Sequence, residues 1–163
     1  MALLKVESMY GSKVLSYLLW KYEDSIQSMG YKVGNTKIAE QQIEHISPQN
    51  PSNGDTIASG YETDENRRYS QDFRNEYLHC LGNLVLISGT HNRIIGNKPF
   101  KDKVASYNEN PVLKQQSEIK KFTNPDYPER WDKEAIDRRH IRIVDEFALQ
   151  KWNFEQVEIF ETI

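Results

Sequence analysis

Apolar residues recur every three to four positions near both ends of the chain. In the first region, followed by Gly30, they predict a leading helix within residues 10–30; they are Leu15, Leu18, Leu19, Tyr22 and Ile26. In the second region, Asp132 can cap a helix whose apolar face carries Ile136, His140, Ile143, Phe147 and Trp152. We expect His140 to be a core histidine.

Two segments between these helices favour strands. Residues 37–46 predict a strand that ends before Pro48, because proline donates no hydrogen bond to a sheet. Residues 77–88 (YLHCLGNLVLIS) are the most strand-like of the chain, with Gly82 as a bulge or bend. The polar stretch 49–76 between them predicts a long loop, with a short helix near residues 66–75.

Several helices are expected after the second strand. Ser88 or Thr90 can cap a short helix, Pro99 suits the first turn of a helix to about Tyr107, and Pro111 begins another to about residue 122. This order predicts an α+β fold with helices around a small hairpin. The 163 residues suit one domain: leading helix 10–30, core 37–107 and helical shell 108–163.

Composition excludes several classes of protein. No apolar stretch approaches the roughly 20 residues of a membrane span, and the N-terminus lacks a signal-peptide pattern, so we expect a cytoplasmic protein and no membrane partner. Cys80 is the single cysteine, which excludes an internal disulfide and any multi-cysteine zinc site. Its apolar surroundings suggest a small buried hydrophobic residue.

The charge is acidic overall and basic in places. A net charge of −3 counts against a nucleic-acid binder. Residues 91–103, however, contain one acidic and four basic residues, Arg93, Lys98, Lys101 and Lys103, and residues 130–142 contain five basic and three acidic residues. A basic face on an acidic body fits phosphate binding. Ordinary solvated helix faces explain the same pattern.

Glu44 and His45 are the first candidates for chemistry. They stand together at the end of the first predicted strand, in Glu44-His45-Ile46-Ser47-Pro48. A carboxylate can bind a hard divalent cation, and an imidazole can take a proton from an attacking water. A surface or capping pair is the alternative explanation.

Two asparagines are further candidates. Asn83 lies in an apolar run, so its amide needs partners, and we expect it to pin the loop after His45 through backbone groups. Asn92 stands at the start of a short helix, where its oxygen can bind a cation; Arg93 and Lys98 follow and could meet a phosphate. His91 could replace or assist Asn92, and His79 is an alternative histidine that is more often structural. The alternatives are a water-facing edge residue for Asn83 and a helix cap for Asn92.

Together these stretches resemble a known family. IEHISPQNP (43–51), YLHCLGNLVLISGTHNRIIGNKPFKDKVASY (77–107), the opening helix and, more loosely, the last helix with Arg138, Arg139 and Trp152 are similar to the HNH-type endonuclease domain with a His-x-x-Pro motif at the C-terminus of GmrSD-type, modification-dependent restriction proteins. The resemblance implies a ββα-metal (His-Me finger) hairpin-helix core inside the helical shell.

The resemblance also implies a role for each site residue. His45 takes the general-base position, Asn83 the central organising position, and Glu44 and Asn92 the metal-ligand positions. Asn97 and Lys98 match a recurrent pair near the site or the phosphate. One divalent ion, Mg²⁺ or Mn²⁺, is the implied cofactor. The zinc-binding Cys-x-x-Cys pairs of many HNH enzymes are missing, so the helical shell must hold the hairpin.

The implied activity is metal-dependent DNA cleavage or nicking by the nuclease module of a phage-defence restriction system. Implied partners are DNA, modified or not, and a nucleotide-hydrolysing regulatory domain or subunit; this chain lacks a phosphate-binding GxxxxGK[ST] loop. We expect it to be the C-terminal part of a longer protein, and a homodimer would serve double-strand cutting. The alternatives are an inactive DNA-binding or interaction module of the same fold, an RNase or toxin of that fold, and an accidental resemblance.

Overall fold

The computed structural model describes residues 8–27, 40–51, 55–109 and 111–152. Within them, the leading helix is α2 (Lys13–Ile26), capped by the Ser12 hydroxyl. The hairpin strands are β1 (Gln41–His45) and β2 (Leu84–Ser88). The other elements are α3 (Gln71–Glu76), the 3-10 turn η3 (Leu81–Asn83), α4 (Gly89–Ile95), α5 (Phe100–Glu109), α6 (Lys114–Ser117), the 3-10 turn η4 (Ile119–Lys121), α7 (Lys133–Ile143), the π-helical segment η5 (Val144–Ala148) and α8 (Leu149–Lys151).

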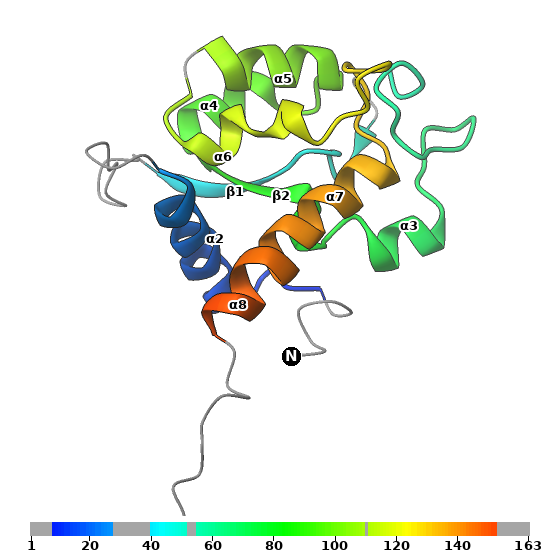
Figure 1. Ribbon diagram of the computed structural model, residues 1–163. Helices are drawn as coiled ribbons and strands as arrows, with labels where there is room; N and C mark the ends of the chain where they lie inside the picture. The colour runs from blue at the N-terminus through cyan, green and yellow to red at the C-terminus, as the bar shows by residue number, and fades with distance from the viewer. Residues whose placement is uncertain (1–7, 28–39, 52–54, 110, 153–163) are drawn as a thin grey trace, which may run out of the picture.

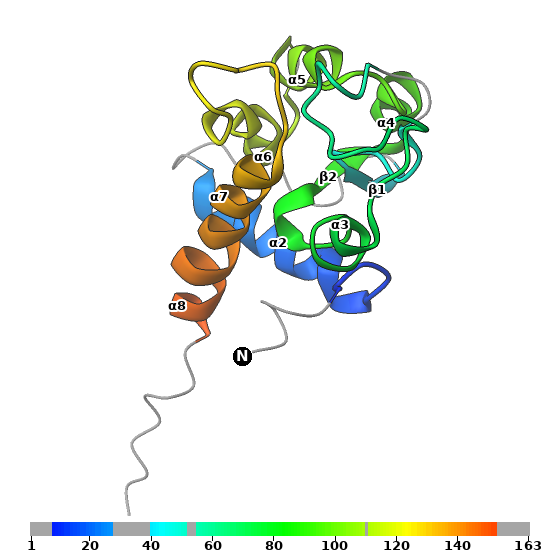
Figure 2. The ribbon, with the colours of Figure 1, turned by 90° about the vertical axis from the view of Figure 1, so that its right-hand side faces the viewer.

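The two strands pair antiparallel at the centre of the molecule. Glu44 lies opposite Val85 and His45 opposite Leu84. Figure 1 shows α4, α5 and α6 above this sheet, α2 below it, and α7 with α8 crossing one side. The view in Figure 2 confirms that α2 and α4 lie on opposite sides of the strands. The α+β prediction is therefore confirmed.

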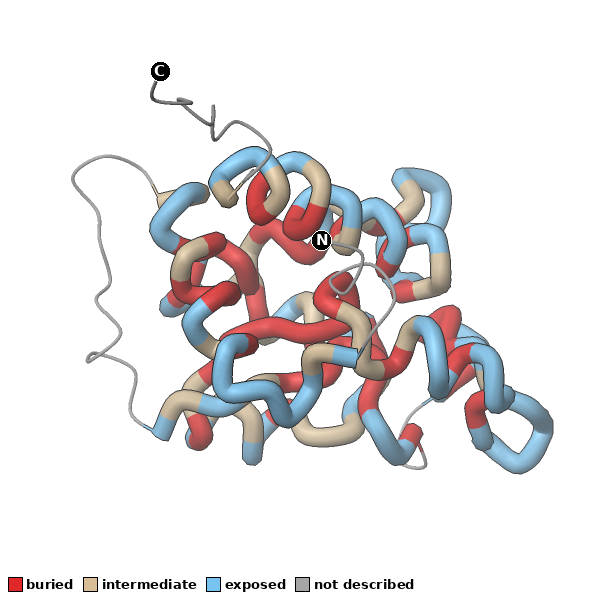
Figure 3. The backbone as a smooth tube through the Cα atoms, turned by 90° about the horizontal axis from the view of Figure 1, so that it is seen from below, coloured by how far each residue is buried: buried red, intermediate tan, exposed pale blue. Residues whose placement is uncertain are grey.

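The alternation of β2 divides the core into two clusters. Leu84 and Leu86 pack with α2 and the end of α7, whereas Val85 and Ile87 pack with α4, α5 and Trp131. Successive side chains of a strand point to opposite faces, and both faces here are covered. Figure 3 shows buried backbone running through the middle of the molecule with exposed turns around it. Glu44, opposite Val85, reaches the α5 side.

The predicted strand 77–88 is wrong in its first half. Residues before Leu84 form turns and η3, and of the two alternatives for Gly82 the bend is correct and the bulge is wrong. Gly82 lies against α7, where an added Cβ would overlap the carbonyl oxygen of Ile136. A side chain at position 82 would therefore block the close approach of α7 to this turn, which apolar composition alone cannot indicate.

The helices depart from prediction in smaller ways. The expected helix from Pro111 is reduced to α6 and η4, and the short helix near residues 66–75 is α3, shifted toward Glu76. Asp132 caps α7 as predicted, by accepting from the amide of Ala135 at 3.0 Å. The predicted regions 28–30 and 37–39 lie outside the described residues. No helix in the described ranges is long and apolar enough to cross a membrane.

Candidate active site

A polar cavity of about 680 Å³ opens between α2, β1 and α4. Four of the residues singled out from the sequence line it: Glu44, His45, Asn92 and Asn97. The other lining residues come from the start of α2, from β1 and from the loop after Pro48; they are Tyr10, Gly11, Ser12, Leu15, Ser16, Gln42, Ile43, Pro48, Gln49 and Asn50. The lining is rich in amides and hydroxyls, and within the described part of the chain Glu44 is its one acidic residue.

Glu44 is paired with a buried lysine. Its Oε1 accepts from the Nζ of Lys103 at 2.5 Å, and Lys103, on α5, is completely buried. Burial raises the pKa of Glu44 and lowers that of Lys103, while each partner opposes the shift of the other. A buried carboxylate without a counter-charge would cost several kcal/mol, and the Lys103 ammonium opposes the loss of charge that burial favours.

His45 is hydrogen-bonded at both ring nitrogens. Its Nε2 lies 2.9 Å from the Nδ1 of His79, and the Nε2 of Gln49 lies 3.3 Å from its Nδ1. An amide NH₂ can only donate, so Nδ1 of His45 accepts and its ring proton sits on Nε2, which donates to His79. Gln49 lines the cavity and His79 does not, so within the described residues Nδ1 is the nitrogen on the cavity side.

Burial lowers the pKa of His45 to about 3, with smaller effects from His79 and Lys103. The pKa of His79, which is half-buried, is also lowered by burial. His45 is therefore neutral at pH 7 and has a lone pair available. Its low pKa also means that a proton on His45 would need further stabilisation.

Tyr10 packs on both histidines. Its ring stacks on His79, with centroids 5.0 Å apart, and meets His45 edge-on at 4.5 Å. The Nε2 of Gln49 also donates to the Tyr10 hydroxyl at 3.2 Å. Residues from before α2, from β1 and from the turn after α3 thus form one cluster beside the cavity.

Asn83 pins the turn after His45, as the sequence predicted. Its Oδ1 accepts from the amide of Ser47 at 2.8 Å and from the Trp131 indole at 3.1 Å. Its Nδ2 donates to the carbonyls of Ser47 at 3.2 Å and Leu78 at 3.0 Å. Asn83 is the last residue of η3 rather than part of a strand, and it is fully buried. Its side chain therefore uses its full hydrogen-bonding capacity within the protein.

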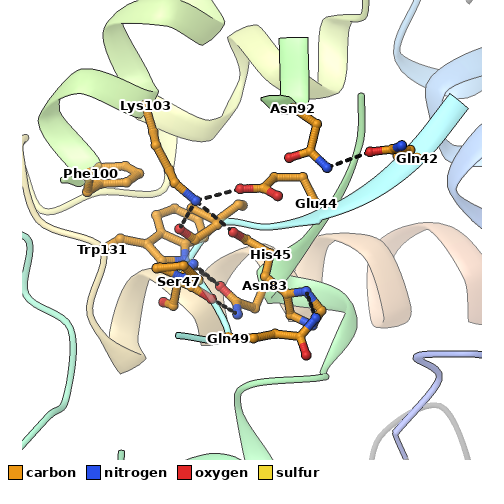
Figure 4. Close-up of polar contacts among 12 residues, drawn as sticks. Gln42, Glu44, His45, Ser47, Gln49, Asn83, Asn92, Phe100, Lys103 and Trp131 are labelled. Carbon is orange, nitrogen blue, oxygen red and sulfur yellow. Dashed lines mark hydrogen bonds and ion pairs between the residues drawn. The ribbon is translucent and has the colours of Figure 1, made fainter. Parts of the chain in front are cut away.

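Asn92 lies across the cavity edge from Glu44. Its Nδ2 donates to the Oε1 of Gln42 at 2.7 Å, and Figure 4 shows its side-chain amide beside the Glu44 carboxylate. Helix α4 holds it there because the Ser88 hydroxyl accepts from the amide of His91 at 3.2 Å and starts the helix directly after β2. The side-chain amide oxygen of Asn92 faces the same region as the Glu44 carboxylate (Figure 4).

The remaining predicted residues lie apart from the cavity or at its rim. Asn97 lines it. Arg93 pairs with Glu40 at 2.9 Å on the exposed side of α4, and Lys98 is exposed beyond the end of that helix. His91 turns toward α5, where its Nε2 lies 2.7 Å from the Ser106 hydroxyl.

The basic face expected over residues 91–103 is only partly present. Lys103 is buried against Glu44, and Lys101 pairs with Glu129 at 3.2 Å. In the second basic stretch, Arg139 is also buried, and its Nη1 donates to the carbonyls of Leu81, Gly82 and Leu84. Charge patterning cannot reveal such residues, because their acceptors lie more than fifty positions away in the sequence.

The donors at the cavity suit a hard cation. A carboxylate from Glu44 and an amide oxygen from Asn92 are the oxygen ligands that Mg²⁺ and Mn²⁺ accept, with water or phosphate completing the shell. No group of three or more His, Cys, Asp or Glu residues that could hold a metal occurs among the described residues.

Sequence reasoning missed several residues of this site. Lys103, Gln49 and Tyr10 surround Glu44 and His45, and Trp131 completes the bonding of Asn83. Gln49 follows His45 by four residues and could have been considered from spacing alone. Lys103, Tyr10 and Trp131 come from distant elements, and only the packing brings them to the hairpin.

Fold and cavity together define the class: an α+β domain whose central hairpin carries an acid–histidine pair into a polar site. The family follows from comparison with known proteins. Residues 2–146 match the family of C-terminal domains of GmrSD restriction endonucleases, and the chain belongs to it. Membership places the chain among the nuclease domains of restriction systems. No curated protein and no solved structure gives a significant match.

Proposed function

We propose that this domain is a metal-dependent DNA endonuclease or nickase of the HNH type, in which β1, β2 and α4 form the ββα-metal core. The observation that carries the proposal is the meeting of Glu44 and His45 from β1 with Asn92 from α4 at one cavity. Family membership supports the nuclease activity and its place in a phage-defence restriction system. The HNH type, the metal and the residue roles are parts of the proposal.

His45 is the proposed general base. A water bound at its Nδ1 would replace the Gln49 amide, whose contact of 3.3 Å is the longest in the cluster. As Nδ1 takes the proton from that water, the Nε2 proton can pass to the Nδ1 of His79, 2.9 Å away. The positive charge then rests on the more accessible His79, which compensates for the low pKa of His45.

Glu44 and Asn92 are the proposed ligands of one divalent ion. Such an ion, when bound, supplies positive charge that stabilises the pentacovalent phosphorane and the leaving 3′ oxygen. Asn83 keeps the turn after His45 in place and so orients the base. Asn97 at the rim, with Lys98 and Arg93 beyond it, is proposed to meet the phosphates of DNA; for Arg93 this requires exchange of its exposed partner Glu40.

A nuclease of a restriction system needs a partner that controls when and where it cuts. We propose that a nucleotide-hydrolysing domain or subunit controls the nuclease and directs it to DNA, modified or not. One site for each chain yields a nick, and a homodimer would yield a double-strand cut.

The test is nicking of supercoiled plasmid DNA with Mg²⁺ or Mn²⁺ against EDTA, comparing the wild type with H45A. We expect metal-dependent relaxation by the wild type and a loss of about 10²- to 10⁴-fold in H45A, the usual effect of removing a general base. H91A is the matched control, because His91 faces Ser106 and not the cavity. Equal cleavage by wild type and H45A contradicts the base assignment. DNA binding without cleavage in any metal favours the inactive DNA-binding module of the same fold.

A further inference from the structure

Lys103 has a complete set of hydrogen-bond acceptors inside the protein. Its Nζ donates to the Oε1 of Glu44 at 2.5 Å, to the carbonyl of His45 at 3.0 Å and to the carbonyl of Ile46 at 3.3 Å. An ammonium has three protons, so every one is used. Lysine is almost never fully buried unless it is paired, yet Lys103 has no exposed surface.

Glu44 lies between this ammonium and the cavity. Figure 4 shows Lys103 reaching down from α5 to the carboxylate and to the backbone at the end of β1, with Asn92 on the other side. Among the described residues, Lys103 does not line the cavity, whereas Glu44 is the only acidic residue that does. The formal charge of the pair is therefore zero at the position where a divalent cation would bind.

We propose that Lys103 is the resident counter-cation of Glu44: it holds the carboxylate at the cavity and weakens divalent-cation binding until a DNA phosphate is present. This inference rests on the proposed metal site at Glu44. An ammonium at hydrogen-bonding distance from the ligand repels a second cation, and low-dielectric surroundings strengthen that repulsion. A phosphodiester adds the negative charge that the cavity lacks, and Mg²⁺ in phosphoryl-transfer sites commonly binds one or two carboxylates plus substrate phosphate.

The bonds of Lys103 to two carbonyls explain how the pair also positions the site. They tie α5 to the backbone of His45 and Ile46, so that one side chain fixes both the carboxylate and the strand end that carries the histidine. A purely structural lysine would stabilise the fold in the same way, but its removal would not strengthen metal binding. The affinity for the metal therefore separates the two roles.

The experiment measures Mn²⁺ binding to the full chain by electron paramagnetic resonance. All variants carry H45A, which prevents cleavage, and the H45A protein is the parent with which they are compared. K103M removes the charge and keeps most of the side-chain volume. Without DNA, we expect K103M to bind Mn²⁺ about tenfold more tightly than the parent, within the usual range of coupling between sites. A short DNA duplex should tighten binding to the parent more than binding to K103M. K101M is the matched control, because Lys101 lies on the same helix but is exposed and pairs with Glu129.

A double variant shows whether an effect of K103M comes from misfolding. K103M leaves Glu44 buried without a counter-charge, whereas E44Q/K103M removes both charges and should retain the circular dichroism spectrum of the parent. If folded K103M binds Mn²⁺ no more tightly than the parent does, the proposal is overturned. Tight Mn²⁺ binding that persists in E44Q/K103M also overturns it. If K103M does not fold, equal Mn²⁺ affinity of the parent with and without DNA still overturns the proposal.

The same measurements separate this inference from the proposed function. Mn²⁺ that binds the parent only through Glu44, as shown by its loss in E44Q, supports the metal site whatever Lys103 does. Absence of Mn²⁺ binding to the parent even with DNA overturns both the metal site and the role of Lys103.

Discussion

The side chain of Asn83 and the backbone of Ser47 form a two-way hydrogen-bonded contact. Asn83 Oδ1 accepts from the Ser47 amide at 2.8 Å, and Asn83 Nδ2 donates to the Ser47 carbonyl at 3.2 Å. The side-chain amide of Asn83 offers one donor and one acceptor, as the backbone of a neighbouring strand would. It thus extends the pairing of β1 and β2 past His45. The backbone amide of Ile46 also donates to the backbone carbonyl of Asn83 at 2.9 Å. The position of the candidate base therefore depends on a residue outside the cavity.

We expect N83A to be both unstable and inactive. It leaves the Ser47 amide, the Trp131 indole and two carbonyls without their buried partner, so the free energy of unfolding should fall by about 3 kcal/mol. Urea denaturation measures the change. N97A is the matched control, since Asn97 is half-buried at the cavity rim and should leave stability nearly unchanged. An N83A domain as stable as N97A would contradict the organising role of Asn83.

His79 variants should separate orientation of His45 from proton transfer. H79F keeps an aromatic ring against Tyr10 but removes the acceptor for His45, and we expect plasmid nicking to slow about tenfold or more, yet less than the about 10²- to 10⁴-fold loss on removing the base. H79N can still accept from His45 but cannot carry the proton. Activity of H79N equal to wild type would reduce His79 to an orienting residue. Activity of H79F equal to wild type would exclude any role.

The lowered pKa of His45 predicts loss of stability in mild acid. The unfolded chain binds a proton at His45 below about pH 6.5, whereas the folded chain does so only near pH 3, so acid favours unfolding between these values. This residue alone should remove about 2 kcal/mol between pH 7 and pH 5. Urea unfolding in EDTA at both pH values should show a smaller loss for H45Q than for the wild type. An identical loss in H45Q would place the titration elsewhere.

Arg139 and Arg138 are neighbours in sequence, but we expect them to contribute very differently to the stability of the domain. Arg139 is fully buried and donates to three carbonyls around η3, so R139M should lower the free energy of unfolding by about 3 kcal/mol or more. Arg138 is exposed, with Glu134 as its ion-pair partner, and R138M should cost less than about 1 kcal/mol. Thermal or urea unfolding of the two variants provides the comparison. Similar losses would contradict the structural role given to Arg139.

Local sequence determined the elements whose signals are local. The three-to-four spacing placed α2, the carboxylate of Asp132 placed the start of α7, and Ser88 was one of the two caps predicted for α4. The same reasoning extended a strand through residues 77–83, because apolar composition fits a strand and a packed turn equally well. The contact that decides between them is the approach of α7 to Gly82, and no local pattern encodes it.

The candidate site divides in the same way. The sequence by itself determined that an acid and a histidine stand side by side near a strand end, that Asn83 needs buried partners, and that Asn92 belongs to a short helix close after the second strand, although it lies in the middle of that helix and not at its start. Only the tertiary structure decided that Lys103 is buried against Glu44, that His79 meets His45, and that Arg93 turns outward to Glu40. The physical reason is that burial and charge pairing depend on residues far apart in the chain, whereas a capping residue or a helical period acts within one or two turns.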